Sequence, residues 1–181
     1  NIEGDERVKV AEPQYIDVPI GSNKTIGEIR SEIEAKVSLK AGWQAEDYCF
    51  YDWRMGGEKG EEMLDATQIT EDITVYARTN YKRFKLSGTT LEGYEGEKPR
   101  GRIIIPKEII SVGYKENDKH KAPFDGCVDL TEVDVSLARE LKYLNLRGTG
   151  ITSIDISNNS SLEYLNLGET EITSLDVSHN P

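Results

Sequence analysis

The sequence predicts an α+β domain over about residues 1–80, followed by a short, β-rich solenoid of stacked repeats over about residues 81–181. Two observations lead to this fold class. Near-identical text recurs every 21 residues in the last third of the chain, which is typical of a repeat architecture. In the first third, one amphipathic helix pattern lies among several strand patterns, as in domains where helix and sheet share a core.

The 21-residue repeat is the strongest signal in the chain. Residues 141–161 and 162–181 are close copies, and 130–140 is a partial one. The matching pairs are Leu141 and Leu162, Leu144 and Leu165, Leu146 and Leu167, Thr149 and Thr170, and Ile151 and Ile172. This spacing of leucines is typical of a leucine-rich repeat, whose copies stack because none can bury its apolar side chains alone. It predicts an extended recognition surface rather than a catalytic pocket, with Ile151–Ser157 favoured as the strand of the concave face.

The first 80 residues contain patterns for one helix and several strands. Thr25 and Glu28 have the spacing of a capping box. The apolar residues that follow at helical spacing are Ile26, Ile29, Ile33 and Val37. The segments expected to be strands are 15–18, 48–53 and 73–77.

A resemblance to a known family covers roughly residues 14–79. Tyr48-Cys49-Phe50-Tyr51-Asp52-Trp53 resembles the G-Y-x-F-x-G-W segment of the Listeria–Bacteroides repeat, the internalin B-repeat family, with Asp47 and Asp52 in place of its glycines. Residues 70–78, TEDITVYAR, are similar to the T-E-D-I-T-L-Y-A-K ending of that family. The resemblance implies that residues 1–80 form a β-grasp domain, a spacer or accessory module of bacterial surface proteins.

A second resemblance begins at Phe84. Ile103-Ile104-Ile105-Pro106, then Ile109 and Val112-Gly113, then Phe124, Cys127 and Leu130 resemble BspA-like leucine-rich repeat regions, apart from the polar insertion 114–121. The resemblance implies that residues 81–181 form a β-hairpin cap, one BspA-like turn and then the 21-residue repeats. Both resemblances imply an extracellular or cell-surface location in bacteria.

Charge and hydropathy exclude several classes of partner. The net charge is -11 and the pI about 4.7, so repulsion of the phosphate backbone argues against nucleic acid. No stretch approaches the roughly 20 apolar residues that span a bilayer. Two distant cysteines, Cys49 and Cys127, are expected to be free, and Cys127 to be buried.

No motif predicts catalysis, a metal site or a cofactor. The chain lacks H-E-x-x-H, paired C-x-x-C and G-x-S-x-G. Its two histidines, His120 and His179, lie in polar segments and are interpreted as solvated loop residues.

The candidate binding residues belong to columns of the repeat. Stacking would place Asp134, Asp155 and Asp176 about 4.8 Å apart, either as a site for a divalent cation or a cationic ligand or as a solvated column. The second reading is favoured because calcium takes roughly six to eight oxygens. Asn145 and Asn166 are further candidates for ligand contact. Asn159 and Asn180 are expected to fix turns.

These observations favour a non-catalytic, cell-surface or secreted adhesion module that recognises a protein or a glycan. The alternatives are an accessory or spacer region of a larger secreted enzyme, and a structural stalk. The last repeat would leave apolar residues exposed: Leu165, Leu167, Ile172 and Leu175. Three alternatives follow: a continuing or very short array, which is favoured, self-association through a strand of a partner chain, or a frayed last turn.

Overall fold

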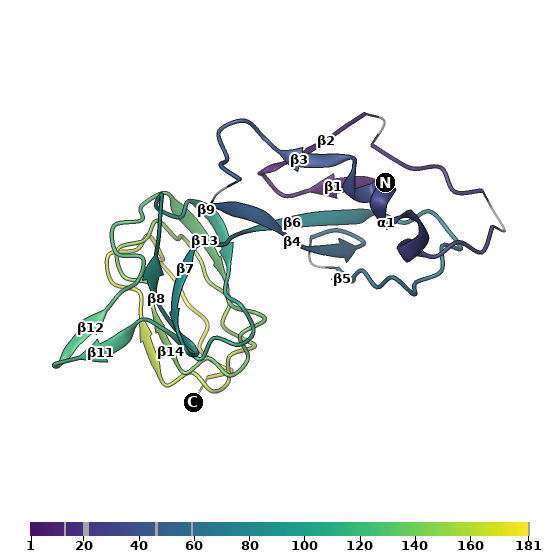
Figure 1. Cartoon of the computed structure of the whole chain (residues 1–181). Helices are drawn as coiled ribbons and strands as arrows, with labels where there is room; N and C mark the ends of the chain where they lie inside the picture. The colour runs from purple at the N-terminus through teal and green to yellow at the C-terminus, as the bar shows by residue number, and fades with distance from the viewer. Residues whose placement is uncertain (13, 20–21, 46, 59, 181) are drawn as a thin grey trace. The chain divides into compact units, whose positions relative to one another are not determined.

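The chain divides into two compact units in the computed structural model, Asn1–Asn80 and Tyr81–Pro181 (Figure 1). The structure describes residues 1–12, 14–19, 22–45, 47–58 and 60–180. Each unit is described by itself.

The first unit is built on a four-stranded sheet of order β1-β6-β4-β5. Its strands are β1 (Ile2–Gly4), β4 (Tyr48–Met55), β5 (Glu61–Glu62) and β6 (Val75–Tyr81). β1 runs parallel to β6, and β5 antiparallel to β4. A separate antiparallel pair joins β2 (Val8–Val10) to β3 (Val37–Leu39).

One helix, α1 (Ile26–Glu34), packs on the core of this unit. Its predicted capping box is confirmed: the Thr25 backbone N–H donates to the Glu28 carboxylate at 2.7 Å, and the Thr25 side chain accepts from the N3 backbone. Together these bonds satisfy donors that a helix N-terminus leaves open. The buried core residues are Ile2, Val8, Ile26, Ile29, Ile33, Trp53, Met63, Val75 and Ala77.

The second unit contains a five-stranded sheet of order β15-β14-β10-β8-β7. Its strands are β7 (Phe84–Ser87), β8 (Thr90–Tyr94), β10 (Ser111–Val112), β14 (Tyr143–Asn145) and β15 (Tyr164–Asn166). β7 and β8 form an antiparallel hairpin, and the remaining neighbours pair in parallel. β9 (Gly101–Ile104) and β13 (Leu130–Asp134) form a parallel pair, and β11 (Tyr114–Glu116) and β12 (Lys119–Lys121) a hairpin that projects from the unit (Figure 1).

The interior of the second unit is apolar. Its fully buried side chains include Leu91, Ile103, Ile104, Ile105, Ile109, Val112, Phe124, Cys127, Leu130, Leu141, Leu144, Leu146 and Ile151. The prediction that Cys127 is buried is confirmed at 1% exposure, and both cysteines are free. The 21-residue offset reappears in the strand register, where Tyr143, Leu144 and Asn145 face Tyr164, Leu165 and Asn166.

The predicted fold class, an α+β β-grasp domain followed by a leucine-rich repeat solenoid, is wrong. Strands make up 34% of the chain and helix 5%, and the strands divide among several small sheets. Ile151–Ser157, expected to be the strand of the concave face, forms no strand, and neither does the equivalent segment 172–178. Because these two segments find no sheet partner, unlike the equivalent strand β13 of the partial copy, the described residues do not form a solenoid.

Two local predictions in the first unit are also wrong. Residues 15–18 form no strand. Val37 lies on β3, since the helix ends at Glu34. Within the described residues, α1 is the only helix and no helix is long and apolar enough to cross a membrane.

Candidate functional site

A row of four side chains crosses the outer face of the five-stranded sheet. Thr90, Ser111, Tyr143 and Tyr164 occupy the same register position on β8, β10, β14 and β15. Successive residues of a strand point to opposite faces, so the buried Leu91, Val112 and Leu144 that follow the first three point inward. The row therefore begins with two small hydroxyl side chains and ends with two half-buried phenols.

The two tyrosine rings stack, and His120 joins them from the hairpin. The Tyr143 and Tyr164 centroids are 4.2 Å apart with planes 7° from parallel. His120 stacks on Tyr164 at 4.5 Å and 4°. The His120 and Tyr143 centroids are 5.9 Å apart. Two rings stacked on opposite faces of Tyr164 would lie farther apart than this. Tyr143 and His120 therefore lie side by side against one face of Tyr164.

A hydrogen bond joins the two rings that lie side by side. His120 Nδ1 and the Tyr143 hydroxyl are 2.6 Å apart. Burial raises the pKa of Tyr143 to about 12, and the neighbouring Tyr164 phenol adds to the shift. The Tyr143 hydroxyl therefore stays protonated over the physiological pH range. We call Tyr143, Tyr164 and His120 the aromatic array.

Ion pairs lie next to the two tyrosines of the aromatic array in the sequence, one pair before them and others after them. Lys142 Nζ lies 3.2 Å from Glu163, and these two residues directly precede Tyr143 and Tyr164 in the sequence. Arg147 lies 2.9 Å from Asp125 and 2.5 Å from Glu169. Lys142 and Arg147 each face a carboxylate, and the hairpin that carries His120 adds Lys115, Lys119 and Lys121, so the surroundings of the rings are polar.

The predicted aspartate column has a structural role at each of its positions. In all three turns an aspartate Oδ1 accepts the backbone N–H of the serine two residues later: Ser136 at 2.9 Å, Ser157 at 3.0 Å and Ser178 at 2.9 Å. This bond lowers the pKa of Asp176. Asp134 also binds Arg102 at 2.7 Å. Among the described residues, no group of three side chains is arranged to hold a metal ion.

The predicted asparagines likewise bond within the unit. Asn145, 1% exposed, accepts the N–H of Arg147 at 3.3 Å, and Asn166 accepts that of Gly168 at 2.9 Å. The prediction that Asn159 and Asn180 fix turns is confirmed. Each donates from Nδ2 to two carbonyl oxygens of the preceding copy.

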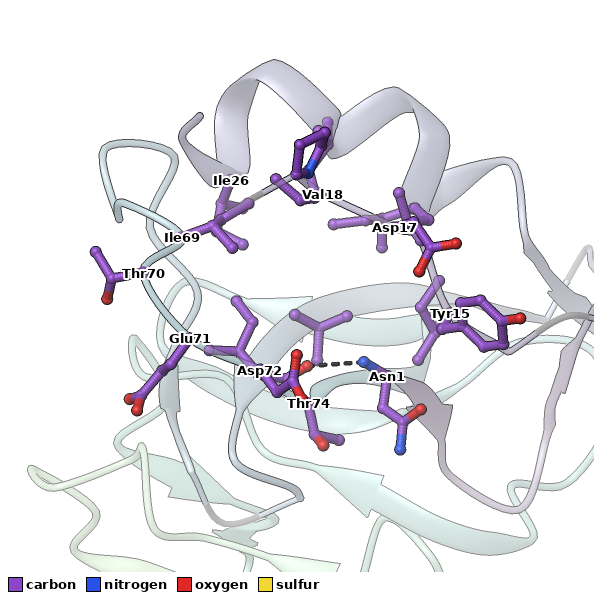
Figure 2. A pocket seen from close by; sticks show the side chains of 17 residues that line it. Asn1, Tyr15, Asp17, Val18, Ile26, Ile69, Thr70, Glu71, Asp72 and Thr74 are labelled. Carbon is purple, nitrogen blue, oxygen red and sulfur yellow. Dashed lines mark hydrogen bonds between the residues drawn. The ribbon is translucent and has the colours of Figure 1, made fainter. Parts of the chain in front are cut away.

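The first unit has a hollow of about 640 Å³ between α1 and the strands. Figure 2 shows Val18, Ile26 and Ile69 directed into it, with Asn1 and Asp72 on the opposite side. Most of its apolar lining belongs to the core of the unit or packs against it, including Ile2, Ile16, Val18, Ile26, Ile29, Ile33, Ile69, Ile73 and Val75. Because the same side chains hold the unit together, we interpret the hollow as the open side of its core.

A buried charged cluster in the first unit forms hydrogen bonds within that unit. Asp5 accepts the backbone N–H of Arg7 at 3.0 Å and that of Thr79 at 2.5 Å. Arg7 lies over the rings of Trp43 and Tyr48 at 4.7 and 4.9 Å. These contacts stabilise the fold and leave the fully buried Arg7 inaccessible to a ligand.

The aromatic array was missed from the sequence, although half of its signal is visible there. Tyr143 and Tyr164 occupy one column of the repeat, in LKYLNL and LEYLNL. His120 was interpreted as a solvated loop residue, and the structure places it on β12 against Tyr164. Comparison with protein-family models, with curated proteins and with solved structures found no match.

Proposed function

We propose that the chain is a non-catalytic interaction module that binds a protein or glycan ligand through the aromatic array. The single observation that carries this proposal is the stacking of Tyr143, Tyr164 and His120 on an outer sheet face. Tyrosines provide large contact area and lose little conformational entropy on binding. They are enriched among the residues that dominate binding energies.

The resemblances to internalin B-repeat modules and BspA-like regions support a setting on the bacterial surface or in the medium. These resemblances are between short motifs that are spread over most of the chain. We use them to infer the cellular location and nothing further. An accessory role in a larger secreted enzyme or a stalk function is the alternative, in which the array has no ligand.

The test is a screen of purified protein and glycan arrays with the wild-type chain and Tyr164→Ala. The proposal predicts at least one ligand that binds the wild type and is lost in the variant. Tyr51→Ala is the matched control, since Tyr51 is a partly exposed tyrosine of the first unit. Tyr15→Ala tests the hollow instead. Capture that is equal in wild type and Tyr164→Ala, or no capture at all, would contradict the proposal.

Self-association through the last copy is a second candidate interaction. Leu165, Leu167, Ile172 and Leu175 are half-buried, whereas Leu144, Leu146 and Ile151 of the preceding copy are fully buried. A second chain that covered these residues would bury more apolar area. Sedimentation velocity tests this: a dimer that Leu165→Gln dissociates would support it, and a monomer at all concentrations would exclude it.

A further inference from the structure

Among the residues that the structure describes, one face of the Tyr164 ring has no aromatic neighbour. Both rings that stack on Tyr164 lie against the same face. β15, which carries Tyr164, is the last strand of its sheet, so within the described part of the chain no strand lies beyond it. The opposite ring face is therefore directed away from the array.

The array holds this ring in place before any ligand arrives. Stacking with Tyr143 and His120 fixes the plane of Tyr164, because offset-stacked aromatic rings attract one another. The hydrogen bond between His120 and Tyr143 links the hairpin β11–β12 to β14. A ligand that stacks on Tyr164 thus binds a ring that is already ordered, which removes part of the entropic cost of binding.

The face of a phenol ring carries partial negative charge and its edge partial positive charge. Three kinds of group lie flat on such a face: a nucleobase, an apolar or cationic protein side chain, and the C–H face of a pyranose sugar. Single-stranded nucleic acids need a basic groove beside the rings. The net charge of -11 disfavours that class, and Lys142, Arg147 and the hairpin residues Lys115 and Lys121 are each paired with a carboxylate.

The polar surroundings of the array separate the remaining two classes. The cores of protein interfaces are depleted in charged residues, whereas the Lys142–Glu163 and Arg147–Glu169 pairs flank these rings. Sugar hydroxyl groups both donate and accept hydrogen bonds, so they fit carboxylate, ammonium and guanidinium side chains at once. An uncharged sugar also avoids repulsion from the acidic surface.

We infer that the aromatic array binds a neutral oligosaccharide, with one pyranose ring stacked on the outer face of Tyr164 and its hydroxyl groups bonded to the flanking ion pairs. This inference rests on the proposed function and specifies its ligand class.

The experiment is saturation-transfer NMR on the full chain with neutral hexasaccharides of glucose, N-acetylglucosamine, xylose and mannose as probes, and an oligogalacturonate as the acidic comparison. At least one neutral probe is expected to receive saturation mainly at ring C–H protons, and to shift the ring resonances of Tyr164. Affinity should fall about tenfold or more in Tyr164→Ala, stay within about threefold in Tyr164→Phe, and remain unchanged in Tyr51→Ala. The wild-type ring shifts keep the test valid even if Tyr164→Ala does not fold.

Three results would overturn the inference: no saturation transfer at millimolar sugar, stronger binding of the acidic probe, or binding that leaves the Tyr164 resonances unmoved. If the array screen finds a protein whose binding requires Tyr164, and no sugar binds, the sugar class is refuted and the proposed function stays intact. No Tyr164-dependent ligand of either class would refute both.

Discussion

Asn159 Nδ2 donates a hydrogen bond of 2.7 Å to the carbonyl oxygen of Ala138, one repeat length upstream in the chain. The same atom reaches the Val135 carbonyl at 3.1 Å, and Asn159 is fully buried. Asn180 repeats the arrangement on Asn159 and Ile156. These bonds add a second donor to turn carbonyls that already accept a backbone N–H: Val135 accepts from Ala138, Ala138 from Leu141, Ile156 from Asn159 and Asn159 from Leu162.

Replacement of Asn159 by alanine is expected to destabilise the second unit by about 1–3 kcal/mol, since two buried hydrogen bonds are lost at about 0.5–1.5 kcal/mol each. Urea unfolding followed by far-ultraviolet circular dichroism measures the loss. Tryptophan fluorescence is an internal control, because both tryptophans, Trp43 and Trp53, belong to the first unit. Asn180→Ala, at a half-buried site, should cost less. An Asn159→Ala midpoint equal to that of the wild type would refute this role.

The aspartate column offers a comparison within one set of equivalent positions. Asp134→Asn is expected to cost about 1–3 kcal/mol, because it removes the negative charge that faces the largely buried Arg102. Asp176→Asn should leave stability unchanged, since an asparagine oxygen can still accept the Ser178 N–H and Asp176 binds no arginine in the described structure. Thermal unfolding of both variants decides the point. Equal effects would mean that the turn bond, and not the ion pair, determines stability.

The parts of the fold that could be predicted from the sequence are those set by residues close together in the chain. The capping box of α1 was readable because its two residues are three positions apart. The repeat predicted that equivalent residues would be neighbours, as Tyr143 and Tyr164 are. It could not show that Ile151–Ser157 would lack a sheet partner, because strand pairing depends on distant segments. The overall fold class was wrong for that reason.

The candidate site had the same limit. The tyrosine column was visible, but its third ring comes from a hairpin 23 residues before Tyr143, and no local pattern places His120 against the sheet. The aspartate and asparagine columns drew attention because they were polar. In the structure these side chains bond to their own turns or to the preceding copy, apart from the Asn145 Nδ2, which is buried without a hydrogen-bond partner among the described residues.

The pH dependence of tyrosine ionisation tests the packing of the array. Tyr143 and Tyr94 both have a pKa of about 12, chiefly through burial, so these two tyrosines should ionise late. The folded state holds their protons more tightly than the unfolded state does. Their contribution to stability is therefore complete below pH 10 and is lost as the pH rises from 10 through about 12.

Ultraviolet titration of tyrosinate measures this directly. Tyr143→Phe should remove one late-ionising group and Tyr94→Phe the other. If Tyr143→Phe leaves the late phase intact, the Tyr143 hydroxyl is not held as described.

The central claim is that the ring of Tyr164 binds the ligand. The most direct measurement is isothermal titration calorimetry of the wild type, Tyr164→Phe and Tyr164→Ala with the ligand that the protein and glycan screen identifies. Loss of the stacking ring in Tyr164→Ala is expected to raise the Kd by about tenfold or more, which corresponds to about 1.4 kcal/mol or more of binding free energy. Tyr164→Phe should keep the Kd within about threefold of the wild type. A folded Tyr164→Ala that binds as tightly as the wild type would contradict the account.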